Sequence, residues 1–123
     1  VRQGEGRCDA GNDEVNPAGR GEVDKRAEAV LQLEGQIPPE IAWVLRVDGH
    51  TDARPLSGTG RFRDNWELSS ASAISVVKYL IGKGISPNHL VAAGFGEFQP
   101  LEEGGSDEAN AKNRRIELKL TER

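Results

Sequence analysis

The sequence is poor in residues that cross-link a fold or hold a metal. Its 123 residues include one cysteine, Cys8, and two histidines, His50 and His89. One cysteine can form neither an intrachain disulfide nor a cysteine zinc cluster, and no HExxH motif or Cys/His cluster is present. We therefore expect no bound metal and no cofactor, and we interpret Cys8 as an incidental or small buried apolar residue.

Long apolar runs and an excess of positive charge are also lacking. There is no run of about 18 apolar residues and no signal-peptide pattern. We therefore expect either a cytosolic protein or one whose targeting and anchoring segment lies outside this sequence. Sixteen basic residues against 20 acidic ones give a net charge of -4, which argues against a nucleic-acid-binding protein with a broad basic face.

Motifs for catalysis are missing as well. No GxSxG elbow occurs, and Ser69, Ser70 and Ser72 fall inside a predicted helix, which argues against a serine nucleophile. His50 and Asp52 lie two residues apart at a strand end and would project to the same side, as a metal or acid–base pair would. Because no ligand cluster accompanies this pair, we interpret His50 as structural or hydrogen-bonding. An enzyme is not expected.

Apolar periodicity divides the chain into alternating helices and strands. Asn16 and Pro17 form a helix start with proline at the first helical position, and Asp64 or Asn65 can cap a second helix. Ile41 opens an alternating apolar run that predicts a central strand. The predicted elements are a frayed arm or weak edge strand over 1–7, helices over 17–34 and 65–82, strands over 41–48, 89–93 and 114–121, and a loop or short helix over 101–112.

The order of these elements, β-α-β-α-β-(α)-β, predicts the fold class. The simplest arrangement is an α/β (α+β) two-layer sandwich with two main helices on one face of a mixed sheet. Hydrophobic residues make up 36% of the chain, which is enough for one core at this length. We therefore expect a single domain over 1–123.

Arg114 and Arg115 precede the last strand and take opposite faces of it. Arg114 has the parity of Ile116 and Leu118, so its side chain should point inward. Arg115 should point outward with Glu117. An inward arginine needs a partner, and two interpretations remain open: an ion pair that only supports the fold, or a group that binds a ligand.

Four separated motifs are the most specific feature of the sequence. They are Val47-Asp48-Gly49-His50-Thr51-Asp52, Asn65-Trp66-Glu67-Leu68-Ser69, Gly94-Phe95-Gly96-Glu97 with Pro100, and Asn113-Arg114-Arg115-Ile116-Glu117. Their order and spacing resemble the OmpA-like C-terminal domain, the family that includes peptidoglycan-associated lipoprotein and the flagellar stator protein MotB. The second motif is most similar to the MotB branch, and the resemblance covers about residues 8–121.

The resemblance implies a non-catalytic domain that binds the diaminopimelate-containing stem peptide of peptidoglycan. It places the carboxylate that takes the ligand ammonium at Asp52, and Asn65 and Arg114 in the same pocket. It also implies a periplasmic domain of a membrane-anchored or outer-membrane-associated protein, tied to the membrane only through an N-terminal segment missing here. Homodimerisation is left open.

One family position departs from the pattern. The arginine that grips the ligand carboxylate in the family is replaced by Ser72. A serine hydroxyl donates one hydrogen bond and brings no charge, so two-pronged recognition of the carboxylate is lost. Losing such a charge-assisted bond costs about 1.5–3 kcal/mol, or on the order of 10- to 150-fold in affinity.

Two alternatives therefore stand beside peptidoglycan binding. The first is a scaffold that has lost its ligand and serves as a dimerisation or protein-interaction domain, as Ser72 would allow. The second is an enzyme acting through Asp52, which would need a second carboxylate, with Asp48 the nearby candidate. The sequence also departs from the family over 1–7, where glycine and charge replace an apolar strand and weaken it.

Overall fold

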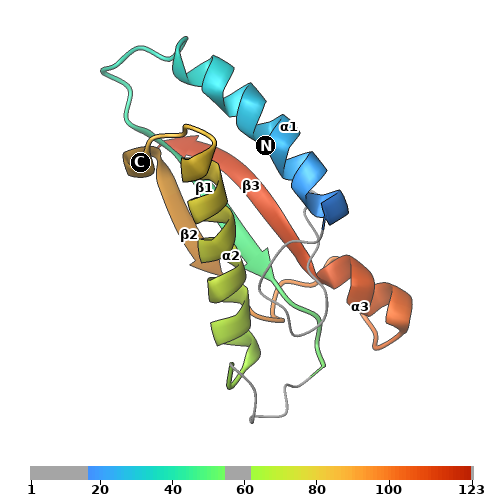
Figure 1. Cartoon of the computed structure of the whole chain (residues 1–123). Coiled ribbons are helices and arrows are strands. Elements are labelled where there is room, and N and C mark those ends of the chain that lie inside the picture. Colours follow the sequence, from blue (N-terminus) through green and yellow to red (C-terminus); the bar gives the residue numbers. More distant parts are fainter. Residues whose placement is uncertain (1–16, 55–61, 123) are drawn as a thin grey trace.

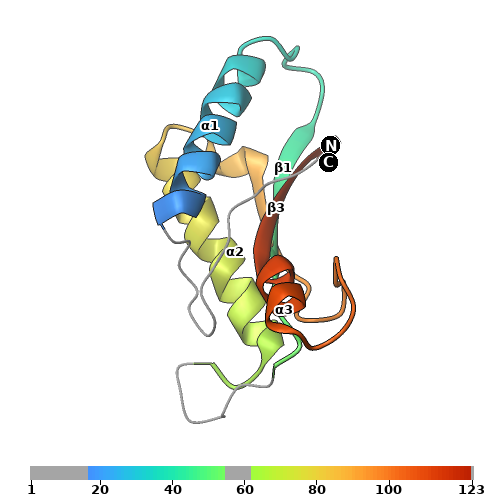
Figure 2. The same ribbon diagram turned by 90° about the vertical axis from the view of Figure 1, so that its right-hand side faces the viewer.

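Two long helices cover one face of a sheet in the computed structural model, which describes residues 17–54 and 62–122 (Figure 1). The elements are α1 (Pro17–Glu34), β1 (Trp43–His50), α2 (Asn65–Gly82), η1 (Pro87–His89), β2 (Leu90–Gly94), α3 (Asp107–Asn113) and β3 (Arg115–Glu122). Seen from the side, α1 and α2 lie on the same side of the strands (Figure 2). This confirms the predicted two-layer α/β sandwich.

The sheet is mixed, and β1 is its central strand. Its strand order over the described residues is β2-β1-β3, with β1 parallel to β2 and antiparallel to β3. The parallel pair is joined through α2, a crossover of the kind that parallel strands require. The ends of β1 and β2 therefore point the same way, and the start of β3 meets them there.

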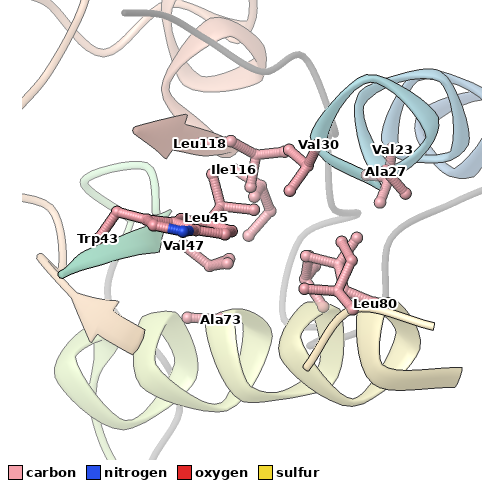
Figure 3. Packing of buried hydrophobic residues seen from close by; sticks show 12 residues of the cluster. Val23, Ala27, Val30, Trp43, Leu45, Val47, Ala73, Leu80, Ile116 and Leu118 are labelled. Carbon is pink, nitrogen blue, oxygen red and sulfur yellow. The ribbon is translucent and has the colours of Figure 1, made fainter. Parts of the chain in front are cut away.

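The core lies between the sheet and the two helices (Figure 3). Alternate residues of β1 face it, and the antiparallel register sets Val47 beside Leu118 on the same face. Both helices contribute residues at helical spacing, so each presents one apolar stripe to the sheet. The buried cluster comprises Val23, Ala27, Val30, Trp43, Leu45, Val47, Ala73, Val76, Leu80, Ile85, Ile116 and Leu118.

A polar cap at one end and a glycine at the other fix the limits of α2. The Asp64 carboxylate accepts a hydrogen bond from the Glu67 amide at 2.9 Å, and the Glu67 side chain accepts one from the Arg63 amide at 3.0 Å. The first bond is that of a capping box, and the second reaches one residue further back, to the residue before the cap. At the other end Gly84 takes a φ of +109°, which ends the helix. The helix therefore begins and ends where the sequence predicts.

Some boundaries differ from the prediction. The strand predicted from Ile41 begins at Trp43, and Ile41 is exposed, because two residues pass before the chain joins the sheet. The short helix predicted within 101–112 covers Asp107–Asn113. The weak strand over 1–7 and Cys8 lie outside the described residues. None of the described helices has the length and apolar character needed to cross a bilayer.

Glycines let α2 approach the sheet closely. A methyl group at Gly49 in β1 would lie 2.1 Å from the backbone oxygen of Ser69, and one at Gly94 in β2 would lie 2.2 Å from the Ser70 hydroxyl oxygen. Both distances are well below van der Waals contact. The first half of α2 can therefore sit directly over the ends of β1 and β2, which positions the polar residues described below.

We expect Gly49→Ala to destabilise the protein by about 1–3 kcal/mol or more, because its methyl group would meet helix backbone that cannot turn aside. Gly82→Ala is the matched control, since nothing lies within 4 Å of its added methyl group. That change should be neutral or stabilise the helix by about 0.5–1 kcal/mol. Urea unfolding of both variants measures the difference, and equal stabilities would contradict the close approach.

Candidate functional site

Three segments meet where β1 ends. Asp52 follows the strand by two residues, Asn65 is the first residue of α2, and Arg114 lies between α3 and β3. The Thr51 amide donates to the Gly96 carbonyl at 2.9 Å, which ties the end of β1 to the loop after β2. The central position of β1 thus brings together residues that are far apart in the sequence.

Asp52 is buried between two arginines. Its side chain is 8% exposed. Arg114 donates from Nη1 to Oδ2 at 2.8 Å, a contact between residues 62 positions apart. Arg54 donates to the same oxygen from Nη2 at 2.8 Å and from Nε at 3.1 Å, and its amide donates to Oδ1 at 3.1 Å. The carboxylate therefore holds two guanidinium groups at once.

The surroundings of Asp52 favour its charged form. Burial by itself would raise the pKa of this carboxyl group, but the hydrogen bonds from Arg114 and Arg54 outweigh it and hold the pKa below the ordinary value. At neutral pH the site thus presents a carboxylate. This carboxylate can bind a cationic group that takes the place of one of its two arginine partners.

Asn65 holds the surrounding loops in place. Its Nδ2 donates to the backbone oxygens of Asp52 at 3.3 Å and Arg54 at 3.1 Å, and to Glu97 Oε1 at 3.2 Å. One amide group therefore links the segment after β1 with the loop after β2. Its contacts with Asp52 are to the backbone, so Asn65 positions the carboxylate without sharing its charge.

Ser72 lies apart from these residues. It is buried on the same side of α2 as Asn65 and Ser69, but about two helical turns beyond Asn65, or roughly 10 Å along the axis. Within the described residues no hydrogen bond joins its side chain to Asp52, Asn65 or Arg114. The structure therefore brings three of the four predicted residues together and leaves the serine too short to reach them.

Arg54 is a site residue that the sequence analysis missed. Its side chain is 49% exposed, and its Nε and Nη2 both donate to Oδ2 of Asp52. The available signal was its offset of two from Asp52, since extended backbone places such residues on one side. Periodicity does not show that the backbone stays extended beyond a strand, so the signal was ambiguous.

The opposite face of the sheet carries a second polar cluster. Arg46 donates to both oxygens of Asp48 at 2.7 and 3.0 Å, and Arg115 donates to Glu117. Arg115 shares a face with Glu117, as predicted, yet it is buried because Nη1 and Nη2 also donate to the Asn113 and Gln99 carbonyls. Arg115 therefore lies on the outer face as predicted, but it is buried there by its contacts with the backbone.

His50 belongs to this outer cluster. Its ring stacks on Phe95, and its Nε2 lies 3.9 Å from Glu117 Oε2. Burial, and then the nearby charge of Arg115, lower the pKa of His50 to about 4 despite the opposing effect of Glu117. The sequence placed His50 and Asp52 on one side of the chain, as a metal or acid–base pair would lie. In the structure the charged neighbours of His50 are instead Glu117 and Arg115 of β3.

The sequence profile of the OmpA family matches residues 9–114 of the chain. Among curated relatives, the uncharacterized protein YtxE of Bacillus subtilis is 35% identical over 101 residues, which cover 81% of this chain and 41% of that protein. Motility protein B of Helicobacter pylori is 33% identical over 91 residues, covering 74% of this chain and 34% of that protein. The chain thus spans well under half of either relative.

A shorter match is to the peptidoglycan-associated lipoprotein of Pseudomonas aeruginosa. It is 37% identical over 73 residues, covering 59% of this chain and 40% of that protein. This relative is a third kind of protein, beside YtxE and motility protein B. All three resemblances fall within one family.

Solved structures agree with these relatives. A putative MotB-like protein from Desulfovibrio vulgaris superposes with a TM-score of 0.78 at 32% identity, over 95% of this chain and 70% of that one. The C-terminal domain of Helicobacter pylori MotB gives 0.82 at 26% identity, over 98% and 86%. The periplasmic domain of MotB gives 0.78 at 28% identity, over 96% and 59%. The chain belongs to the OmpA family, as a MotB-like and non-catalytic domain.

Proposed function

We propose that this domain binds peptidoglycan through the diaminopimelate residue of the stem peptide, and so ties the protein that carries it to the cell wall. The observation that carries the proposal is the buried, charged Asp52 held between Arg114 and Arg54 at the position of the family carboxylate. Support comes from the peptidoglycan-associated lipoprotein among its relatives. The periplasm is the matching compartment, with a membrane-anchored or outer-membrane-associated protein as the carrier.

The chemistry of the ligand matches the charges of this site. The side-chain end of diaminopimelate carries an ammonium and a carboxylate on one carbon atom. In our proposal the ammonium takes the place of Arg54 on Asp52, because Arg54 is half-exposed and can turn outward, whereas Arg114 is partly buried. The released Arg54 then grips the ligand carboxylate with its planar fork. Two ion pairs thus replace one, and no charge is left unpaired.

This exchange gives Arg54 the task that Ser72 cannot perform. The family arginine at position 72 would approach the ligand carboxylate from α2, whereas Arg54 approaches it from the loop after β1. The Arg54 amide donates to Asp52 Oδ1 at 3.1 Å, so its backbone stays beside the carboxylate while the guanidinium turns toward the ligand. We infer that binding survives the substitution in weakened form.

The alternative is a scaffold that has lost the ligand and serves as a dimerisation or protein-interaction domain. It is favoured by Ser72, and by the fact that Asp52 already has two arginine partners that a ligand must compete with. In this alternative the Asp52–Arg114 pair only holds the end of β1 to the start of β3. The proposed exchange and the scaffold differ in one measurable property, which is affinity for the stem peptide.

The first test compares two stem peptides by calorimetric titration, one with diaminopimelate and one with lysine at the same position. Lysine keeps the ammonium and lacks the adjacent carboxylate. We expect the diaminopimelate peptide to bind roughly 10- to 150-fold more tightly, the effect of one charge-assisted contact. Equal affinities would mean that Arg54 does not bind the ligand carboxylate. If neither peptide binds, and sedimentation shows dimers, the scaffold alternative replaces our proposal.

The second test replaces Asp52 with asparagine, which should abolish stem-peptide binding because the ammonium loses its counter-charge. A solvent-facing carboxylate could be removed at little cost to the fold. Asp52 is buried instead, and we predict a loss of stability of about 1–3 kcal/mol, since Arg114 would lose its ion pair with the Asp52 carboxylate. Binding is therefore measured well below the lower melting temperature.

Glu102→Gln is the control for this variant. It breaks the exposed ion pair of Glu102 with Lys112, and should leave binding unchanged at a cost of less than about 1 kcal/mol. Asp52→Asn with reduced stability but full affinity would show that Asp52 is structural only.

The third test introduces arginine at position 72. Ser72→Arg should strengthen binding of the diaminopimelate peptide by about tenfold, because a second guanidinium becomes available to the ligand carboxylate. Ala71→Arg carries the same charge one position around α2 and should have a smaller effect, since successive helix residues face about 100° apart. Equal gains from both variants would mean that net charge, and not position 72, sets the affinity.

A further inference from the structure

The outer face of the sheet brings three metal-ligating side chains together. Asp48 and His50 are two residues apart in β1 and share this face, and the antiparallel register sets Glu117 of β3 directly beside Asp48. One ligand atom from each of the three lies within 4.8 Å of the others. Neighbouring strands, and not a flexible loop, hold this group.

His50 is a buried imidazole with no hydrogen-bond partner among residues 17–54 and 62–122. Its side chain is 5% exposed, and within these residues neither Nδ1 nor Nε2 makes a hydrogen bond. The 3.9 Å between Nε2 and Glu117 Oε2 exceeds hydrogen-bonding range. Phe95 stacks on the ring at 4.9 Å with only 6° between the planes. Phe95 thus packs against one face of the imidazole, while the distance from Nε2 to Glu117 Oε2 places that edge of the ring near the carboxylate.

The imidazole lies beside two carboxylates that could share a metal ion with it. One oxygen of Asp48 and one of Glu117 lie within 4.8 Å of a ring nitrogen. A buried polar group of this kind ordinarily has a partner, and a metal ion would supply one.

We propose that Asp48, His50 and Glu117 form a binding site for a divalent transition-metal ion, for which Zn²⁺ is the best match. One imidazole nitrogen and two carboxylate oxygens are ligands that Zn²⁺ accepts, with water as the fourth. Zinc–ligand distances of about 2.0–2.2 Å place tetrahedral ligand atoms roughly 3.3 Å apart. The present spacing must therefore close by about 1.5 Å at most, which carboxylate rotation can provide.

Nearby cations compete for the same carboxylates. Arg46 contacts both oxygens of Asp48, and Lys119 lies 3.9 Å from Asp48 Oδ2. Their side chains are 36% and 43% exposed, so both can turn into solvent when a metal ion arrives. Arg115 is buried, but its bonds to the Asn113 and Gln99 carbonyls hold it in place while Glu117 turns. Arg46 thus competes with the metal ion for the Asp48 carboxylate and must leave it when the ion binds.

Calorimetric titration with ZnCl₂ in a non-chelating buffer tests the site, in a Cys8→Ser background that removes the thiol. We expect binding of one equivalent, weakened at least tenfold by His50→Gln. His89→Gln is the matched control, because His89 stacks on Trp43 and contacts Glu34 elsewhere in the fold. That variant should bind as the parent does. No binding by the parent, or equal binding by both variants, would overturn the proposal.

Competition between Arg46 and the metal ion predicts a variant that binds Zn²⁺ more tightly than the parent does. Arg46→Gln should tighten Zn²⁺ binding several-fold, because Asp48 loses its guanidinium partner. Removing a cation elsewhere on the surface should leave the affinity for Zn²⁺ unchanged. Imidazole resonances in the unmutated protein provide an independent measurement that does not depend on any variant folding. Zinc should shift the His50 ring nitrogens and leave those of His89 in place. Unchanged affinity in Arg46→Gln, or shifts at His89 alone, would count against the site.

Discussion

The close approach of α2 to the ends of β1 and β2 is the constraint on which the candidate site depends. Gly49 and Gly94 leave no side chain between the sheet and the helix backbone at Ser69 and Ser70. At this distance the Ser69 hydroxyl can accept a hydrogen bond from the Gly96 amide at 2.9 Å. A larger residue at either glycine would push the helix outward and separate Asn65 from the loops it now joins.

Three carboxylates in and beside the sheet are neutralised in the same way, each by an arginine close to it in the sequence. Asp48, Asp52 and Glu117 each pair with an arginine two residues away in the sequence. In β1 and β3 the extended backbone puts residues at this offset on one side, and after β1 a bend at Ala53 brings Arg54 back to Asp52. Each carboxylate thus finds a counter-charge within its own segment. Arg114 departs from the pattern, because its bond to Asp52 links two distant parts of the chain and closes the end of the sheet.

These three arginines differ in how firmly they are held. Arg54 is exposed and depends on Asp52 for its contacts, so it can yield to a ligand, and Arg46 has the same freedom on the outer face. Arg115 is fixed by two carbonyl groups as well as by Glu117. A domain that exchanges one mobile guanidinium for a ligand cation can bind without leaving a buried charge unpaired. This supports both proposed sites on the same physical ground, although neither depends on the other.

The sequence by itself determined the helices, the central strand and the two-layer class, because apolar periodicity, the Asp64 cap and the terminating glycines are local signals. It also placed Asp52, Asn65 and Arg114 in one candidate site through the family resemblance. Only the tertiary structure decided which charged groups meet. The register of β1 with β3 sets Glu117 beside Asp48 and buries Arg115, while the turn after β1 brings Arg54 back onto Asp52. Parity along one strand gives the face of a side chain, but the neighbour across the sheet and the path of a loop are fixed by packing between distant segments.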